Sequence, residues 1–78
     1  MVKLIKEDID LLKQINDKEI NEYIEQMQDY TLEEDVVVNF YEVLGEKSAL
    51  YLSQNDNSTK ESNIIEKVMD YIYDVTNN

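Results

Sequence analysis

The chain contains no proline and a single glycine, Gly45, among its 78 residues. Proline and glycine are the residues that most often interrupt helices and build tight turns. A chain that almost lacks both is expected to form helices joined by a few polar segments. We therefore predict an all-α fold, a small bundle of three or four helices that residues 1–78 form as a single acidic domain.

The segment from Tyr30 to Leu50 allows two interpretations. Its run of three valines and the following aromatic pair are typical of a β-strand, whereas Thr31 and Glu34 have the spacing of a capping box that begins a helix. At about 100° per residue, most apolar residues of the segment share one helical stripe. The stripe contains Leu32, Val36, Val37, Phe40, Val43, Leu44, Leu50 and Tyr51. We predict a helix with Thr31 as its N-cap, and the alternative is an α+β fold with a hairpin at about 36–52.

The first segment, from Leu4 to Tyr30, has a helical pattern with one polar interruption. Asn16 interrupts the apolar face, so that either one helix bends there or two helices meet with Asn16 or Asp17 as an N-cap. Because the phase continues across the interruption, we predict one continuous or kinked helix. Its apolar face contains Ile5, Ile9, Leu12, Ile20, Tyr23, Met27 and Tyr30, and it leaves out Leu11, Ile15 and Ile24.

The last helix is predicted to follow residues 53–62, a polar segment rich in Asn, Ser and Asp that forms the most convincing loop of the chain. Ser58 and Glu61 have the spacing of a second capping box near the end of this loop. The buried face of the helix is then expected to contain Ile64, Ile65, Val68, Met69, Ile72 and Val75.

The charge of the chain limits its partners. Eighteen Asp and Glu residues oppose seven lysines, and the net charge is −11. Such a charge repels nucleic acid and anionic membranes, so neither is predicted as a direct partner, and it favours association with a basic protein. The sequence has no apolar run long enough to cross a membrane, and its N-terminus lacks the apolar core of a signal peptide. These two features predict a cytoplasmic location.

The residue types present argue against catalysis. Without cysteine or histidine, the chain lacks a thiolate nucleophile, the usual general base and the usual zinc ligands. The Leu44–Ser48 stretch resembles the end of a phosphate-binding loop, but one glycine cannot form the glycine-rich cradle. Residues 54–62 carry closely spaced oxygen ligands, but they lack the glycine and the final glutamate of a calcium-binding loop. We predict that the protein is not an enzyme and has no cofactor and no metal site.

The most informative feature is the arrangement of carboxylates. On each of three helical segments they recur at helical spacing away from the apolar stripe, with few compensating lysines. The three rows are Glu22, Glu25 and Asp29; Asp35, Glu42 and Glu46; and Glu66, Asp70 and Asp74. Three tyrosines, Tyr41, Tyr71 and Tyr73, fall off the apolar stripes and are expected at the surface, where tyrosine suits a protein interface. Tyr41 and Tyr73 are the two predicted to contact a partner.

The rows have two interpretations. In the first, they form a solvated face that keeps the protein soluble. In the second, they imitate a nucleic-acid backbone, because four helical residues rise about 6 Å and such a row places negative charges at intervals comparable to phosphates along a strand. A protein of this kind would block the basic channel of a nucleic-acid-handling enzyme. Some small acidic anti-CRISPR and anti-restriction proteins of phages and other mobile elements act in this way, and the analogy is one of charge and size.

The leading hypothesis is therefore a non-enzymatic, DNA-mimicking inhibitor that binds a basic nucleic-acid-handling protein through these carboxylates. The alternative is a small helical interaction or immunity protein that recognises its partner through an apolar surface containing Tyr41 and Tyr73. The sequence leaves the identity of the partner and self-association open. Salt separates the two hypotheses, because charge-driven binding weakens with ionic strength and apolar recognition does not.

Overall fold

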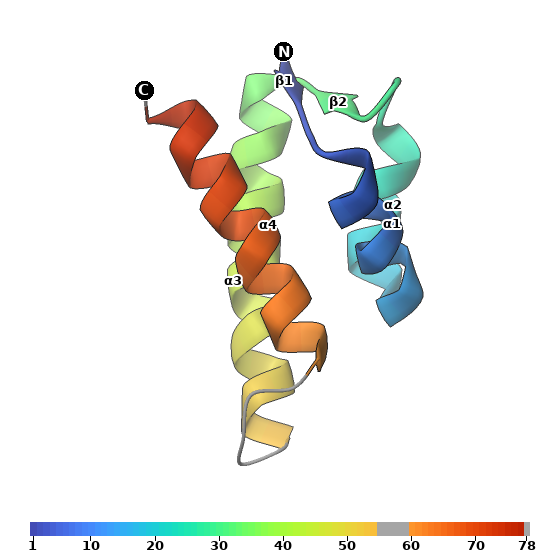
Figure 1. Ribbon diagram of the computed structural model, residues 1–78, viewed down its shortest axis with the longest axis vertical. Helices are drawn as coiled ribbons and strands as arrows, with labels where there is room; N and C mark the ends of the chain where they lie inside the picture. Colours follow the sequence, from blue (N-terminus) through green and yellow to red (C-terminus); the bar gives the residue numbers. More distant parts are fainter. Residues whose placement is uncertain (55–59, 78) are drawn as a thin grey trace.

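The computed structural model describes residues 1–54 and 60–77 (Figure 1). In this part of the chain, four helices accompany a two-stranded antiparallel sheet. The elements are β1 (Val2–Lys3), α1 (Lys6–Ile15), α2 (Lys18–Gln26), β2 (Thr31–Leu32), α3 (Glu34–Gln54) and α4 (Lys60–Thr76). The predicted all-α bundle is confirmed. The hairpin considered for residues 36–52 is wrong, because α3 spans that range.

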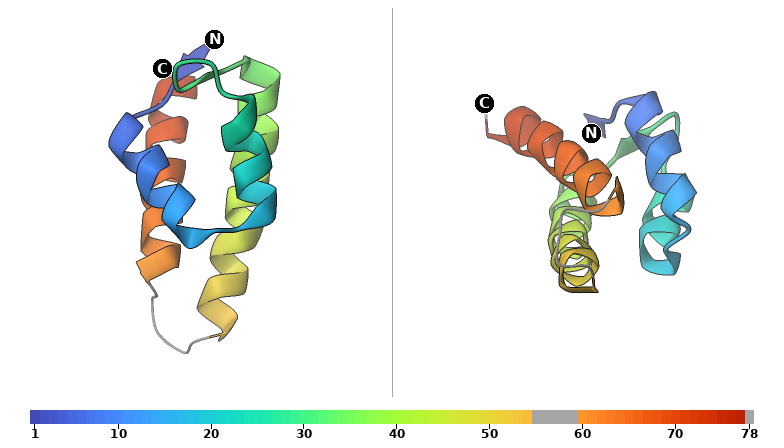
Figure 2. Two further views of the ribbon diagram at one scale, coloured as in Figure 1. Left: turned by 90° about the vertical axis from the view of Figure 1, so that its right-hand side faces the viewer. Right: turned by 60° about the horizontal axis from the view of Figure 1, so that its bottom comes forward.

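The four helices form two layers. α3 and α4 lie side by side in one layer, and α1 and α2 form the other (Figures 1 and 2). α1 packs on α4, and α2 packs on α3. Both layers and the short strands contribute to one hydrophobic core. Its buried residues are Leu4, Ile9, Leu12, Ile20, Ile24, Leu32, Val37, Phe40, Leu44, Ile65, Val68 and Ile72.

The first helical segment is divided, so the predicted continuous helix over residues 4–30 is wrong. Asn16 follows α1 with a left-handed backbone conformation, φ 60°. Asp17 is the N-cap of α2, and its carboxylate accepts a hydrogen bond of 3.2 Å from the backbone N–H of Ile20. Asparagine tolerates the left-handed region and aspartate is a strong N-cap, so this pair turns the chain. The alternative with Asp17 as N-cap is the correct one.

The division changes which apolar residues are buried. Ile24, predicted outside the apolar face, is buried, whereas Ile5, predicted within it, is exposed. Met27 and Tyr30, also predicted on the helical face, lie beyond the end of α2. Because α2 starts at its own N-cap, its rotation is set by its packing on α3 and not by continuation of the pattern from α1.

The chain reverses direction after α2. Asp29 and Tyr30 both have positive φ, 53° and 62°. On either side of them, the backbone groups of Gln28 and Thr31 exchange two hydrogen bonds of 3.2 and 3.1 Å. Positive φ at both central residues is what a two-residue type I′ turn requires. The backbone N–H of Leu4 donates to the Tyr30 carbonyl (2.7 Å) and ties this turn to the N-terminal segment.

The strand after this turn replaces a predicted helix cap. β2 pairs antiparallel with β1, so that Val2 lies opposite Leu32 and Lys3 opposite Thr31. Thr31 is therefore a strand residue, and its hydroxyl donates to the Gln28 carbonyl in the preceding turn. The prediction of Thr31 as an N-cap is wrong, because α3 begins only at Glu34.

The helix α3 forms although it contains three consecutive valines. Val37, Phe40 and Leu44 recur at intervals of three and four and are all fully buried. A strand would point Val37 and Phe40 to opposite faces, so only a helix buries both against one core. The ring of Phe40 also packs against Tyr23 of α2, with 5.3 Å between the ring centroids. Burial of this face outweighs the β-propensity of the valines. Leu50, predicted on the same stripe, is exposed.

The predicted loop at residues 53–62 is too long at both ends. α3 continues to Gln54, and α4 begins at Lys60. The predicted cap, Ser58, lies outside the described residues. Most of the apolar face predicted for the last helix is confirmed, but Val75 is exposed. The fully or partly buried members are Ile64, Ile65, Val68, Met69 and Ile72.

Candidate binding surface

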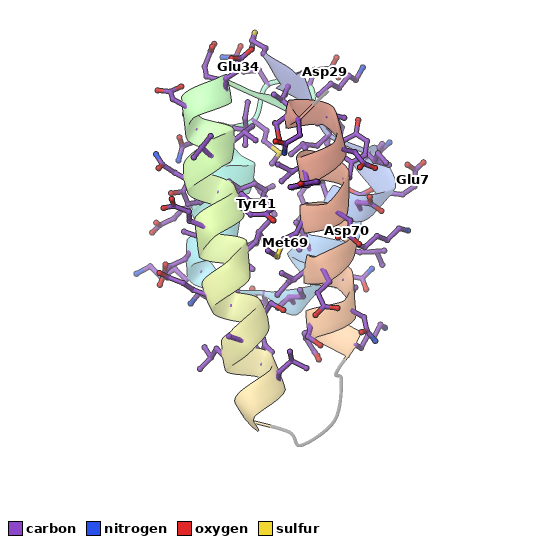
Figure 3. All side chains as sticks on the ribbon, turned by 90° about the vertical axis from the view of Figure 1, so that its left-hand side faces the viewer. Glu7, Asp29, Glu34, Tyr41, Met69 and Asp70 are labelled. Atoms are coloured by element: carbon purple, nitrogen blue, oxygen red, sulfur yellow. The ribbon has the colours of Figure 1, made fainter. Side chains whose placement is uncertain are left out.

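The layer formed by α3 and α4 has an outer side that no described element covers. α1 and α2 pack against its inner side (Figure 2), and Figure 3 looks onto the outer side. We call this outer side the α3–α4 face. Its exposed residues include Asp35, Val38, Glu42, Glu46, Glu66, Asp70, Tyr73 and Asp74.

Two of the three predicted carboxylate rows lie on this face. At about 100° per residue, the α3 row is directed away from the buried Phe40 and Leu44. The α4 row is directed away from the buried Ile65 and Ile72 in the same manner. All members of both rows are exposed. They are Asp35, Glu42 and Glu46 on α3, and Glu66, Asp70 and Asp74 on α4.

The third predicted row lies elsewhere. Glu22 and Glu25 are exposed on α2 and line a separate open hollow of about 480 Å³. Asp29 lies beyond the end of α2, in the turn before β2, so its prediction as a member of the same helical row is wrong. The structure therefore places the α3 and α4 carboxylates on one layer and the α2 carboxylates on the other.

The salt bridges of the described residues join the two layers. Lys47 on α3 lies 3.3 Å from the carboxylate of Asp17 and 3.3 Å from that of Glu19. Lys67 on α4 lies 3.3 Å from the carboxylate of Asp8, which is buried. Each lysine thus reaches from the α3–α4 layer to a carboxylate at the start of α1 or α2. These pairs stabilise the contact between layers and direct positive charge toward the α1–α2 layer.

The carboxylate of Asp17 is the centre of a polar cluster. The Tyr51 hydroxyl donates to it over 2.9 Å, in addition to the Ile20 N–H and Lys47. Partial burial raises the pKa of Asp17, but these hydrogen bonds together lower that pKa below its ordinary value. Desolvation lowers the pKa of Lys47, but its contacts with Glu19 and Asp17 raise it overall. Burial and the bond to Asp17 raise the pKa of Tyr51. Each shift favours the charge state present at neutral pH, so the cluster is suited to holding α2 on α3.

An apolar groove of about 280 Å³ lies between α3 and α4. Tyr41 lies between the two helices in Figure 3, near Met69. Val38 is 56% exposed and Tyr73 is 58% exposed, although both are large and apolar. We call this the α3–α4 groove. It is lined by Val37, Val38, Tyr41, Ile72, Tyr73, Thr76 and Asn77. The structure therefore brings Tyr41 and Tyr73 together. Tyr71, also predicted at the surface, is half-buried, and its hydroxyl donates to the Lys3 carbonyl over 2.9 Å.

The sequence prediction missed Val38 as a groove residue. The signal was present, because Val38 and Tyr41 are three residues apart and both lie off the main apolar stripe. Such a pair forms a second, narrow apolar strip on α3. What the sequence alone does not give is the pairing of this strip with Tyr73, which depends on how α4 packs beside α3.

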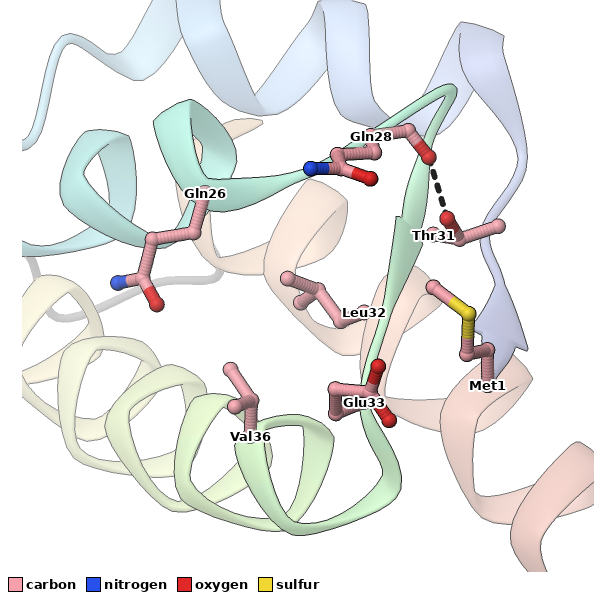
Figure 4. A pocket seen from close by; sticks show the side chains of 7 residues that line it. All are labelled: Met1, Gln26, Gln28, Thr31, Leu32, Glu33 and Val36. Atoms are coloured by element: carbon pink, nitrogen blue, oxygen red, sulfur yellow. Dashed lines mark hydrogen bonds between the residues drawn. The ribbon is translucent and has the colours of Figure 1, made fainter.

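A smaller hollow of about 190 Å³ lies beside the β1–β2 sheet (Figure 4). Its lining consists of Met1, Gln26, Gln28, Thr31, Leu32, Glu33 and Val36. Glu33 contributes the one carboxylate of this lining, so the hollow holds no pair of titratable side chains for acid–base chemistry. Among the described residues, no group of three acidic side chains lies close enough to hold a metal ion.

Comparisons of the chain with protein-family models, with curated proteins and with solved structures give no match. Within the described part of the chain, no helix combines the length and the apolar composition needed to cross a bilayer. Function is therefore inferred from the chemistry of the α3–α4 face itself.

Proposed function

We propose that this protein is a non-enzymatic acidic inhibitor that binds the basic, nucleic-acid-binding surface of a partner protein. The observation that carries the proposal is the position of the α3 and α4 carboxylate rows. Both rows lie exposed on the α3–α4 face, which no described element covers. In this proposal the face takes the place of a nucleic-acid backbone, and the protein acts in the cytoplasm.

Electrostatics gives this face two advantages as a mimic. Along α4, Glu66, Asp70 and Asp74 follow one another at intervals of four residues, which corresponds to about 6 Å of rise. A surface that presents such charges attracts a Lys/Arg-lined channel and accelerates encounter with it. A net charge of −11 on 78 residues adds a long-range attraction to the same partner. The analogy with anti-CRISPR and anti-restriction inhibitors remains one of charge and size.

The test uses two triple variants that change the net charge equally. In the first, Glu66, Asp70 and Asp74 on the α3–α4 face are all replaced by lysine. In the second, the control, Glu22, Glu25 and Asp29 near α2 are replaced by lysine. The wild type and both variants are immobilised, exposed to a cell lysate at low and high salt, and eluted with double-stranded DNA. Circular dichroism checks that each variant remains helical.

We expect the wild type to retain nucleic-acid-binding proteins that salt and DNA both release, because charged surfaces compete for the same basic channel. The α4 variant is expected to lose them and the α2 variant to keep them. The proposal fails if bound proteins resist both salt and DNA. It also fails if the two variants lose binding equally, because binding would then follow net charge and not the α3–α4 face.

A second candidate is an interaction or immunity protein that recognises its partner mainly through apolar contacts. The specific observation that favours it is the joint position of Tyr41 and Tyr73 in the α3–α4 groove. In that case Tyr73→Ala abolishes binding, neither triple variant does so, and the complex persists at high salt. Tyr73 is the better site for this test, because it is exposed and its truncation leaves the core intact.

A further inference from the structure

The α3–α4 groove has the form of a site for a protein side chain. Its floor is formed by Val37 and Ile72, which belong to the hydrophobic core, and its rim by the exposed Val38 and Tyr73. Its volume, about 280 Å³, is slightly below the roughly 300–1,000 Å³ that is usual for small-molecule sites. An apolar side chain that enters it would contact core residues directly and would cover two exposed apolar residues. Such a buried anchor is typical of the centre of a protein interface.

Carboxylates flank the groove on both helices. On α3, Asp35 lies three residues before Val38 and Glu42 four residues after it, so both are its neighbours on the helix surface. On α4, Asp70 lies three residues before Tyr73. Each of these carboxylates is exposed. A segment that places an apolar side chain in the groove therefore brings its own flanking residues close to negative charge from two sides.

The negative charge around the groove distinguishes between its possible occupants. A second copy of the chain would bring another −11 charge and set like-charged rows against each other. An acidic or neutral helix would leave the flanking carboxylates without partners. An amphipathic basic helix satisfies both features, because its apolar stripe supplies the anchor and lysine or arginine one turn away pairs with the carboxylates.

We propose that the α3–α4 groove takes an apolar side chain from an amphipathic basic helix of the partner protein. The proposal rests on the proposed function, in which the α3–α4 face is the partner-binding surface, and it adds the feature that distinguishes one basic partner from another. The carboxylate rows attract any basic surface, and the groove selects the surface that carries an apolar residue between its positive charges.

The test uses two labelled synthetic peptides of about 18 residues, or five helical turns, made of lysine and leucine. In one peptide the leucines recur at i, i+3, i+4 and i+7 and form an apolar stripe. The other has the same composition in a scrambled order without a stripe. Binding of each peptide to the full chain is measured by fluorescence anisotropy, and sedimentation establishes the oligomeric state of the protein.

The matched variants are Val38→Ser in the groove and Val75→Ser outside it. Both replace an exposed valine in a helix, and Val75 does not line the groove. We expect the wild type to bind the striped peptide about tenfold more tightly than the scrambled one, because only the striped peptide buries an apolar anchor. Val38→Ser and Tyr73→Ser are expected to remove this preference without changing the affinity for the scrambled peptide. Val75→Ser is expected to keep it.

The outcomes separate this proposal from the proposed function. Equal, salt-sensitive binding of both peptides overturns the groove proposal and leaves charge-driven recognition standing. A preference that survives both groove variants places the peptide elsewhere and also overturns it. If the wild type is a dimer that Val38→Ser dissociates, the groove is occupied by a second copy, and the proposal is wrong. Absence of binding to either peptide overturns the proposed function together with the groove proposal.

Discussion

Replacement of Asp17 by alanine tests the division of the first segment into α1 and α2. The substitution removes the N-cap of α2, the acceptor of the Tyr51 hydroxyl and one partner of Lys47. Loss of an N-cap costs about 0.5–2 kcal/mol, loss of the hydroxyl bond about 0.5–1.5 kcal/mol, and loss of a partly exposed ion pair less than about 1 kcal/mol. Because one carboxylate makes all three contacts, we expect the free energy of unfolding to fall by about 1.5–3 kcal/mol.

The assay is urea denaturation followed by circular dichroism, with the change read from the midpoint at constant slope. Two variants divide the effect. Asp17→Asn keeps a capping side chain and an acceptor for Tyr51, so it is expected to cost less than about 1 kcal/mol. Tyr51→Phe removes only the hydroxyl and is expected to cost about 0.5–1.5 kcal/mol. Combined with Asp17→Ala, Tyr51→Phe should add little further loss, because the two residues share one hydrogen bond.

An increase in the free energy of unfolding on replacement of Asp17 by alanine would refute this reasoning. If residues 4–30 formed one continuous helix, Asp17 would lie in its interior, and alanine would raise stability by about 0.5 kcal/mol through its higher helix propensity. The pH dependence of stability is a second check. The pKa of Asp17 in the folded protein is lowered from its ordinary value of 3.8. Any advantage of the wild type over Asp17→Asn that arises from this shift is therefore complete above that value and is lost as the pH falls through the lower, folded-state pKa.

Four other substitutions test the fold. Gly45→Ala is expected to stabilise the protein by about 0.5–1 kcal/mol, because alanine favours the interior of α3 and the added methyl group would meet the Met69 methyl group at an ordinary 3.5 Å; a loss in urea midpoint would mean that the helices cannot accept it. Thr31→Val should change the free energy of unfolding by less than about 1 kcal/mol, since the strand preference of valine offsets the loss of the exposed hydroxyl bond to the Gln28 carbonyl, whereas a true N-cap would cost up to about 2 kcal/mol. Ile24→Ala should cost about 2–5 kcal/mol and Ile5→Ala less than about 1 kcal/mol in the same assay, because the first is buried and the second exposed; the reverse order would favour the continuous helix.

The helical periodicity of the sequence correctly predicted the helices and most of the core. It did so best for α3 and α4, where Val37, Phe40 and Ile72 lie on the predicted faces and are buried. It failed at the break between α1 and α2, because the apolar phase happens to continue through the interruption. The local chemistry of Asn16 and Asp17 was a better guide there, since the left-handed conformation and the N-cap are short-range preferences of these residue types.

Periodicity could not predict the β1–β2 sheet. Each strand has two residues, too few to establish an alternating pattern, and the pairing joins Val2 to Leu32 across most of the first half of the chain. Thr31 and Glu34 have the spacing of a capping box, but the turn at Asp29 and Tyr30 places Thr31 in the strand instead. A non-local contact thus overrode a local signal.

The candidate surface was predicted only in part, because it too depends on non-local contacts. Periodicity places carboxylates on the outer sides of α3 and α4, and this holds for both rows. Which rows share a face depends on how separate helices pack, and the periodicity of each helix gives no information about that packing. Only the fold therefore brings Tyr41 beside Tyr73 and places Glu22 and Glu25 on the other layer.

The distribution of charge separates two kinds of carboxylate. Asp8 and Asp17 are shielded between the layers, where lysines reach them. On the α3–α4 face, like charges instead follow one another four residues apart from Glu42 to Glu46 and from Glu66 through Asp70 to Asp74, and each such pair costs a few tenths of a kcal/mol. Asp74 also lies in the last turn of α4, where the helix dipole favours positive charge. Solubility alone does not require these costs, because the same carboxylates spread around each helix would serve it equally well. The proposed basic partner would account for carboxylates beside an open apolar groove, because its binding would relieve the repulsion and cover the exposed Val38 and Tyr73 together.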